Sequence, residues 1–223
     1  MKKFELTNEF IANRFGTKLF RIRALVEFGD VEAGELGGYV EKESNLGHDD
    51  NAWVYGNAQV SGNARVYGNA RVCGNALVCG NAQVSGNARV YGNAWVYGDA
   101  QVSGNALVCG NAWVYGNAWV YGDAQVSGDA RVCGDARVCG NGDYAYAHGF
   151  GSVNRTTTFF RLKDGGVGVR CGCFYGTLAQ FRDKIRETHG ETKKAQEYLM
   201  LADLMELRFE EDENEVGNRK YVE

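Results

Sequence analysis

Apolar residues recur with a period of six through the middle of the chain. From Val54 to Val138 a valine stands at every sixth position, fifteen times without an insertion or deletion. An alanine precedes each valine by two residues, so on an extended strand both side chains lie on one face. Gly followed by Asn or Asp separates the strands, and such pairs tolerate positive φ at a corner. The pattern predicts short strands that stack on copies of themselves around a core of Ala and Val.

The repeat unit, as in Val54-Tyr55-Gly56-Asn57-Ala58-Gln59, resembles the bacterial hexapeptide-repeat family. That resemblance implies a left-handed parallel β-helix with three hexads per coil, so the fifteen hexads would fill about five coils of 18 residues. We therefore expect a mainly β fold, in which this β-helix carries an N-terminal β cap and a C-terminal ββαα module.

The period is confined to the middle of the chain and divides it into three parts. Residues 1–50 are predicted to form N-terminal strands and a cap, residues 51–141 the β-helix, and residues 142–223 a ββαα module with an acidic tail. A cap is expected because the end of a β-helix exposes unpaired strand edges and open core.

The N-terminal flank contains two candidate strands, at residues 3–6 and 18–28. The spacing from Val40 to Leu46 is already six, but the step from Leu46 to Val54 is eight. Residues 47–50 should therefore bulge or loop out at the first coil.

The C-terminal flank alternates between polar and apolar residues and then becomes helical. Residues 156–163 and 167–174 predict a hairpin, preceded by a Gly-containing bridge at 143–152. Thr177, with a Gln three residues later, predicts a helix with a capping box, and a second helix is predicted at 191–209.

Wrapping the repeat at 18 residues per coil sorts its outward side chains into three unequal faces. One of them, the aromatic face, carries Leu77, Trp95, Tyr97, Trp113 and Tyr115. Because apolar patches of this extent are usually covered, we expect a subunit interface of a homo-oligomer, most simply a trimer, or a docking surface for a cap. The alternatives are rings that stack only on one another, or an aromatic groove that binds a ligand.

The corner positions favour amides over carboxylates. Asn occupies eleven of the fifteen corner sites and Asp four, and no Asp lies directly above another Asp in the 18-residue columns. Stacked carboxylates would repel, whereas Asn amides can form hydrogen bonds from coil to coil.

The net charge and composition of the chain limit the classes of partner that it is expected to bind. The chain has 223 residues, a net charge of −4 and a pI near 5.5, so no basic field favours nucleic acid or an anionic membrane. Neither a membrane-spanning apolar run nor a signal peptide is evident, so a cytoplasmic protein is expected. The layout, including Gly-Glu-Leu-Gly-Gly-Tyr-Val at 34–40, is similar to bacteriophage and prophage hexapeptide-repeat proteins, which would place it in the host cytoplasm. That resemblance implies no particular activity.

The seven cysteines do not predict a disulfide framework. Five of them occupy the repeat position shared with Ser and Tyr, which we interpret as a surface position with reduced thiols. Cys171 and Cys173 would lie on the same side of a strand, but no second Cys pair is near enough in sequence to complete a metal site. We expect neither a metal nor a cofactor.

A polar, Gly-containing segment at residues 149–158 is the best candidate binding site. Its backbone amides and nearby side chains suit a phosphate or another anion. The candidate residues are Ser152, Asn154, Arg155, Thr156, Arg161 and Arg170. The favoured function is therefore a non-catalytic oligomeric binding protein, and its specific version is a phage accessory protein that sequesters a small anionic ligand such as a nucleotide immune signal. The simpler alternative is an ordinary connection whose polar side chains satisfy the turn.

Two other functions remain open. The family resemblance includes CoA-dependent acyltransferases, which use a general-base histidine and loops that interrupt the repeat; here the repeat has neither, and His48 and His148 lie outside it. No catalytic residue is assigned. A purely structural scaffold or adaptor, which holds the flanks apart and presents the aromatic face, is the third reading.

Overall fold

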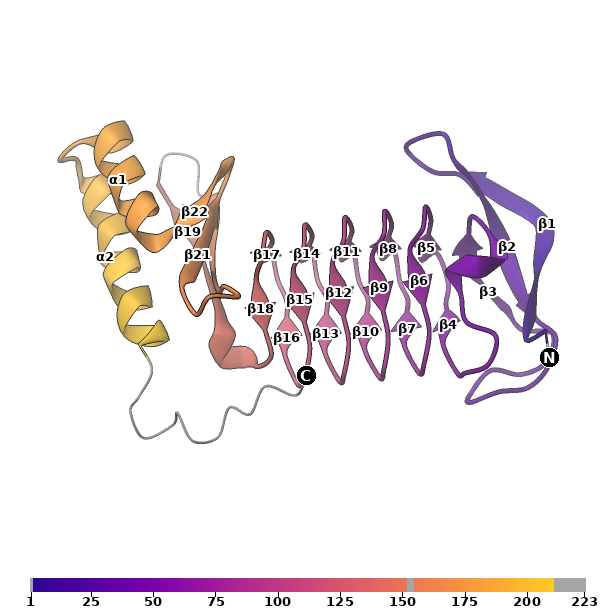
Figure 1. The fold of residues 1–223 in the computed structure, drawn as a ribbon. Coiled ribbons are helices and arrows are strands. Elements are labelled where there is room, and N and C mark those ends of the chain that lie inside the picture. Colours follow the sequence, from indigo (N-terminus) through magenta and orange to yellow (C-terminus); the bar gives the residue numbers. More distant parts are fainter. Residues whose placement is uncertain (1, 152–154, 211–223) are drawn as a thin grey trace.

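A parallel β-solenoid forms the centre of the molecule. The computed structural model describes residues 2–151 and 155–210, and the coils stack side by side between two flanking parts (Figure 1). Each repeat contributes one two-residue strand: β4 (Trp53–Val54), β5 (Gln59–Val60), β6 (Arg65–Val66), β7 (Arg71–Val72), β8 (Leu77–Val78), β9 (Gln83–Val84), β10 (Arg89–Val90), β11 (Trp95–Val96), β12 (Gln101–Val102), β13 (Leu107–Val108), β14 (Trp113–Val114), β15 (Trp119–Val120), β16 (Gln125–Val126), β17 (Arg131–Val132) and β18 (Arg137–Val138).

The strands pair in register with the repeat one coil later. In β11 and β14, for example, Trp95 lies beside Trp113 and Val96 beside Val114, which confirms the 18-residue coil. Three parallel sheets result, one for each face of the prism.

Alanine and valine fill the interior, as the alternation predicted. Every repeat Ala and Val from Ala52 to Val138 is fully buried. The corners require glycine for two reasons, which Gly98 illustrates. Its φ is +73°, and a Cβ built on it would lie 3.0 Å from the backbone nitrogen of Gly116 in the next coil.

The fifteen hexads stack with the expected 18-residue spacing, and an additional coil that the period does not reveal brings the solenoid to about six coils. β3 (Leu36–Val40) pairs in parallel with β5 and places Val40 beside Val60. Leu46 forms a bridge with Val66, and β4 completes this additional first coil. The eight-residue step hides the coil in the linear period, because residues 47–50 loop out as predicted. Asp50 holds the loop, and its carboxylate accepts a hydrogen bond from the Gly68 N–H at 2.6 Å.

The N-terminal part extends one solenoid sheet. β1 (Phe4–Ala12) and β2 (Lys18–Ala24) are antiparallel, and β2 pairs with β3, so an eight-stranded sheet runs β1-β2-β3-β5-β8-β11-β14-β17. The two predicted strands are therefore confirmed with shifted ends. A short 3₁₀ helix, η1 (Glu43–Asn45), follows β3. Lys3, only 3% exposed, donates from Nζ to the carbonyl oxygens of Asp50 and Ala52, both at 2.8 Å, and so ties β1 to the first coil.

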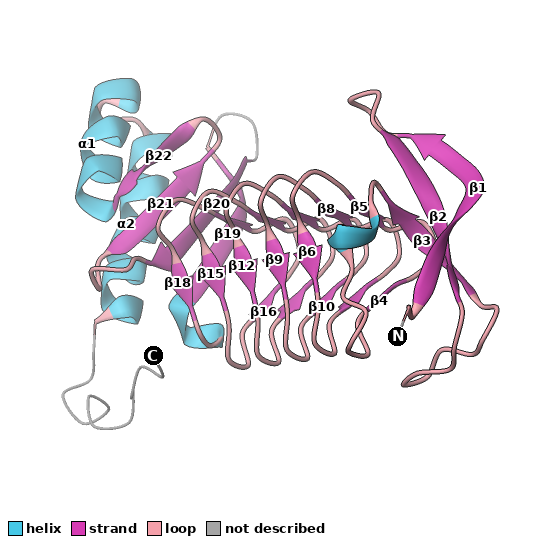
Figure 2. Ribbon diagram, turned by 45° about the vertical axis from the view of Figure 1, so that its right-hand side comes forward, coloured by secondary structure: helices cyan, strands magenta, loops and turns pink. Residues whose placement is uncertain are grey.

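The C-terminal part is a four-stranded antiparallel sheet followed by two helices (Figure 2). Its elements are η2 (Asn141–Asp143), β19 (Tyr144–Phe150), β20 (Arg155–Arg161), β21 (Val167–Cys171), β22 (Phe174–Thr177), α1 (Leu178–His189) and α2 (Lys193–Phe209). The predicted hairpin corresponds to β20 and β21. The segment interpreted as a bridge is instead strand β19, because its alternating Tyr and Ala pair with β20.

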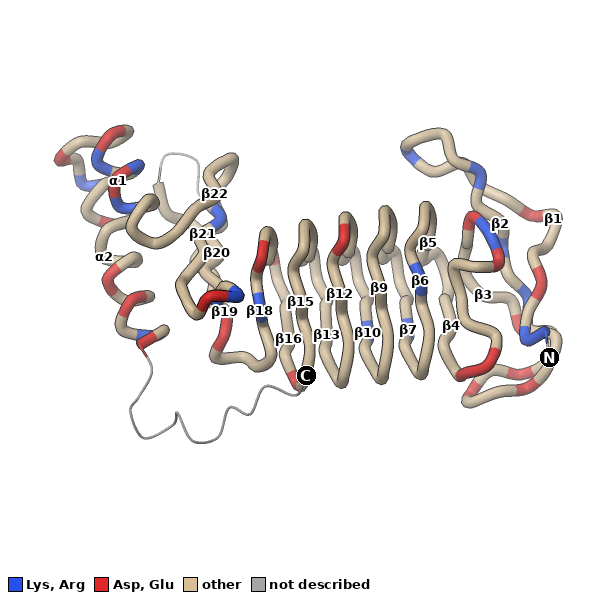
Figure 3. Tube along the Cα trace, viewed as in Figure 1, with Lys and Arg blue, Asp and Glu red and all other residues tan. Residues whose placement is uncertain are grey.

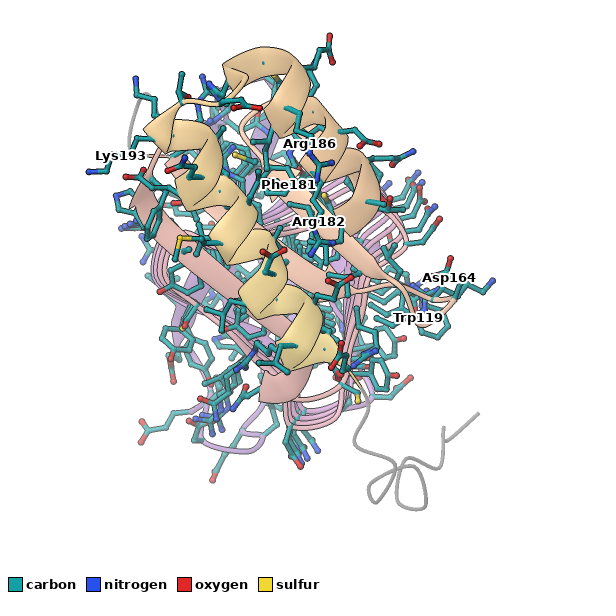
Figure 4. All side chains as sticks on the ribbon, turned by 90° about the vertical axis from the view of Figure 1, so that its left-hand side faces the viewer. Trp119, Asp164, Phe181, Arg182, Arg186 and Lys193 are labelled. Carbon is teal, nitrogen blue, oxygen red and sulfur yellow. The ribbon has the colours of Figure 1, made fainter. Side chains whose placement is uncertain are left out.

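The two helices cover the outer face of this sheet, at the end of the solenoid (Figure 4). The capping box is confirmed: the Gln180 N–H donates to Thr177 Oγ1 at 3.3 Å, and the Thr177 N–H donates to Gln180 Oε1 at 2.9 Å. Phe181 of α1 packs against Phe159 of β20 and Tyr198 of α2, with ring centroids 6.0 and 5.8 Å away. Within the described ranges, no helix is both long and apolar enough to cross a membrane.

Candidate functional site

The aromatic face consists of half-buried rings that stack along the solenoid axis. Trp95 and Trp113 lie parallel, with ring centroids 4.9 Å apart, and Tyr97 and Tyr115 do the same at 4.8 Å. Ring stacking follows from strand pairing, since the residues are one coil apart in register. This is the stacking considered above as an alternative; whether the face also forms a subunit interface stays a prediction.

A guanidinium group lies over each outer face of the stacked indole pair. Arg14, in the loop between β1 and β2, lies 4.2 Å from the Trp95 ring centroid, and Arg131 lies 4.7 Å from that of Trp113. Cation–π contacts of this kind orient the guanidinium and leave its edge available for hydrogen bonds.

An open cleft of about 520 Å³ lies where the aromatic face meets the C-terminal sheet. Solenoid and C-terminal side chains line it together: Asn111, Trp113, Asp129, Arg131, His148, Arg155, Thr156 and Gly172. We call it the C-terminal cleft.

Backbone pairing holds the two walls of the C-terminal cleft in place. The Arg131 N–H donates to Thr158 Oγ1 at 2.9 Å, so the last coil is bonded to β20. A bridge joins Ala136 to Leu162, and the Lys163 N–H donates to the Asp135 carbonyl oxygen at 3.0 Å. The relative position of the walls is therefore set by the fold, as a preformed site requires.

The lining carries cationic and hydrogen-bonding groups. Arg131 comes from β17 and Arg155 from β20, while the Asp129 carboxylate accepts the side-chain amide of Asn111 at 3.0 Å. His148 Nδ1 and Thr156 Oγ1 lie 2.9 Å apart in a hydrogen bond. Two guanidinium groups facing one carboxylate give the cleft a net positive charge, which suits an anion.

Gly172 makes room for the Arg155 side chain. Its φ is +58°, and a Cβ built on it would lie 1.9 Å from Arg155 Nη1. A side chain at this turn between β21 and β22 would be strained by the positive φ and would require the Arg155 guanidinium to shift.

Of the six binding residues predicted from sequence, the structure places two in the C-terminal cleft. Arg155 and Thr156 line the C-terminal cleft, whereas Ser152 and Asn154 lie outside the described residues. Arg170 is not among the lining residues; its Nη1 donates to the Cys173 carbonyl oxygen at 3.4 Å.

Arg161 lies away from the C-terminal cleft, inside the C-terminal part. It is 8% exposed, and its Nη2 donates to the Phe209 carbonyl oxygen at 3.1 Å. Its Nε lies 3.7 Å from Oδ1 of the buried Asp143. These contacts place Arg161 in the packing between η2, β20 and α2.

Sequence reasoning missed Trp113, Arg131 and His148 as lining residues of one cleft. The signal for the first two was present, because the 18-residue wrapping placed Arg131 above Trp113 at the end of the solenoid. Their meeting with His148 depends on how β19 folds back, which no local pattern reports.

One repeat cysteine departs from the expected surface position. Cys133 is 2% exposed beneath the C-terminal part, whereas Cys73, Cys79, Cys109 and Cys139 are half-buried. Burial raises the pKa of the Cys133 thiol, and burial followed by a hydrogen bond with Cys133 raises the pKa of Tyr115. The described part of the chain contains no group of three or more His, Cys, Asp and Glu side chains arranged to hold a metal ion.

Comparison with known families concerns the repeats. Residues 58–73, 82–98, 100–116, 108–122 and 124–140 match the sequence model for the YdcK Beta solenoid repeat. No curated protein matches the chain at a significant level.

Proposed function

The chain is a β-solenoid protein with repeats of the YdcK type, and from this premise we propose that it is a non-catalytic binding protein for a small anionic ligand. One observation carries the proposal: Arg131 of the last coil and Arg155 of the C-terminal sheet line the same cleft. Two guanidinium groups that belong to different parts of the fold, held by backbone pairing, offer forked hydrogen bonds to one phosphate or carboxylate.

The remaining lining favours a ligand with both polar and apolar portions. Thr156 and His148 offer a hydroxyl and an imidazole beside the arginines, and the indole edge of Trp113 offers apolar surface. A nucleotide combines a phosphate with a flat ring, and a volume of about 520 Å³ is in the usual range for such ligands. A nucleotide immune signal sequestered by a phage accessory protein is the specific version of this proposal.

Asp129 narrows the choice among nucleotides. Its carboxylate lines the same cleft and would repel a chain of phosphates. We therefore favour a ligand with one phosphate per nucleoside, such as a cyclic nucleotide or a nucleoside monophosphate, over a triphosphate.

Self-association belongs to the same proposal. Trp95, Tyr97, Trp113 and Tyr115 offer half-buried apolar surface beside the C-terminal cleft, and a homotrimer would cover it. Sizing of the purified protein tests this point, since a monomer at micromolar concentration would contradict an interface at Trp95 and Trp113.

A thermal-shift panel tests the ligand. Stabilisation follows RT ln(1 + [L]/Kd), so a ligand at about 100 times its Kd should add about 2.7 kcal/mol. Cyclic nucleotides and monophosphates should shift the wild type, and Arg131→Gln or Arg155→Gln should lose the shift. Arg137→Gln is the matched control, because Arg137 also lies over a tryptophan, 4.4 Å from the Trp119 ring centroid, but does not line the C-terminal cleft. A shift equally large in Arg131→Gln, Arg155→Gln and wild type would refute this site.

A CoA-dependent acyltransferase is the second candidate, and His148 is the observation that favours it. This histidine lines the C-terminal cleft and bonds to Thr156, whereas Nδ1 of His48 already accepts the Lys3 N–H at 3.2 Å. Acyl-CoAs therefore belong in the same panel. A shift with acyl-CoA alone would favour the enzyme, and the absence of any shift would leave the scaffold function.

A further inference from the structure

A second cleft lies at the opposite end of the solenoid. It measures about 600 Å³ and is formed where the first coil and η1 meet the second coil. Its lining includes Lys42, Ser44, His48, Asp49, Arg65 and Tyr67. We call it the N-terminal cleft. Figure 3 shows that charged residues are sparse along the coils and gather in the two flanking parts.

Side chains fix the wall of the N-terminal cleft to the second coil. Asn45, which is fully buried, donates from Nδ2 to the carbonyl oxygens of Gly62 and Ala64 at 3.1 and 2.8 Å. The Glu41 carboxylate accepts the Gly62 N–H at 2.6 Å. With Asp50 bonded to Gly68 on the far side of the loop, the wall is anchored at both ends and the cleft is preformed.

His48 is held in one orientation and one tautomer. The ring of Phe4 stacks on it, with centroids 4.4 Å apart and planes at 15°. The Lys3 backbone N–H donates to Nδ1, so in the neutral ring the proton is on Nε2. The remaining polar atom of this cleft-lining imidazole is therefore a fixed hydrogen-bond donor.

The charges around His48 favour an oxyanion. The lining carries two cationic side chains, Lys42 and Arg65, and two carboxylates, Glu43 and Asp49. Glu43 forms an ion pair with Lys2, so the two cations are opposed by one further carboxylate, that of Asp49. The Lys42 ammonium lies 3.1 Å from Asn63 Oδ1, and the Arg65 guanidinium lies 5.9 Å from the Tyr67 ring centroid. These contacts leave further donors on both cations for a ligand.

We propose that the N-terminal cleft is a second ligand site, which binds the phosphate group of a small molecule. Arg65 and Lys42 supply charge-assisted hydrogen bonds, and Nε2–H of His48 supplies a neutral one. The site is independent of the C-terminal cleft, because its lining residues come from the first and second coils alone.

Imidazole NMR with inorganic phosphate as the probe tests both ends at once, since the chain has only three histidines. Long-range ¹H–¹⁵N spectra should show His48 with its proton on Nε2, and its signals should shift as phosphate is added. Arg65→Gln should weaken phosphate affinity measured at His48 by about tenfold or more, as expected for a lost charge-assisted bond. Lys42→Gln should act in the same direction.

Arg89→Gln is the matched control, because Arg89 occupies the same repeat position on another face and is not in the N-terminal cleft. It should leave the His48 titration unchanged. His48 signals that ignore phosphate, or that titrate equally in Arg65→Gln and wild type, would overturn the proposal. Phosphate binding in the C-terminal cleft, or its absence, would be observed separately in the imidazole signals of His148.

Discussion

Asn81 donates its side-chain amide to Asp99 in the next coil, at 2.9 Å from Nδ2 to Oδ1. The same bond, always from the earlier coil to the later one, repeats along all three corners of the solenoid. Examples are Asn69 to Asn87 at 3.1 Å and Asn93 to Asn111 at 3.2 Å. Because every bond in the ladder runs in one direction, the last side chain of each column only accepts a hydrogen bond and has no later side chain to which it could donate. Aspartate suits that last position.

Asp99 is the exception within this ladder, because it stands in the middle of a corner column and cannot donate to Asn117. Asp99→Asn should restore the missing bond and raise the free energy of unfolding by about 0.5–1 kcal/mol. Asn93→Asp should lower it by a similar amount, since its bond to Asn111 is lost. Urea unfolding measures both. Asp135→Asn is the control, because Asp135 only accepts, from Asn117 at 3.1 Å, at the last coil; an equal gain there would contradict the ladder.

Gly98→Ala should lower the free energy of unfolding by about 1–2 kcal/mol from the left-handed backbone alone. The close approach of its Cβ to Gly116 should add to that loss. Gly142→Ala provides the comparison, since an added Cβ there meets nothing within 4 Å and its φ is not positive. Similar losses in both variants, measured by thermal unfolding, would show that corner geometry is not the cause.

Arg161→Gln should lower the free energy of unfolding by about 3 kcal/mol, because it removes the cation beside buried Asp143. Arg170→Gln should have a smaller effect on stability, since its guanidinium faces no buried carboxylate in the contacts described and instead donates to the Cys173 carbonyl oxygen at 3.4 Å and lies 6.0 Å from the Tyr115 ring centroid. Chemical unfolding followed by circular dichroism distinguishes them. If Arg161→Gln instead left stability unchanged and weakened ligand binding, Arg161 would be a binding residue after all.

Tyr198 should make stability fall with rising pH in the alkaline range. Burial, and then the neighbouring Cys171, raise the pKa of Tyr198 from 10.0 to about 12. The folded state therefore keeps this proton while the unfolded state loses it, so stability present below pH 10 is lost between pH 10 and 12. Urea midpoints should decline less steeply with pH in Tyr198→Phe than in wild type. Identical slopes would show that the hydroxyl is not shielded.

The regular part of the fold was predictable because each unit contacts only its neighbours. Val96 is buried and Gly98 turns a corner for reasons visible within one hexad, and the partner of Trp95 is always one coil away. The same holds for the cap of α1, where Thr177 and Gln180 are three residues apart. Local interactions decide all of these positions.

The rest depends on contacts between distant segments. Val40 belongs to the solenoid although a loop interrupts the spacing after Leu46, and only its pairing with Val60 reveals the sixth coil. Arg155 and Arg161 are both basic residues of one strand, yet one lines the C-terminal cleft and the other is buried beside Asp143. The two residues are six positions apart and therefore share a face of β20, so the difference arises from the segments that meet each end of the strand. No period in the sequence encodes those contacts.

The strict pairing of each strand with the strand 18 residues later means that the length of the solenoid is set by its number of coils. Removal or duplication of one complete coil would preserve every corner and every column, and would change the length by about 4.8 Å. Insertion of a single hexad between Trp113 and Arg131 would rotate the following faces and separate these two residues. The distance between the two ends of the molecule can thus vary only in whole steps, and the two clefts keep the same orientation about the axis at each step.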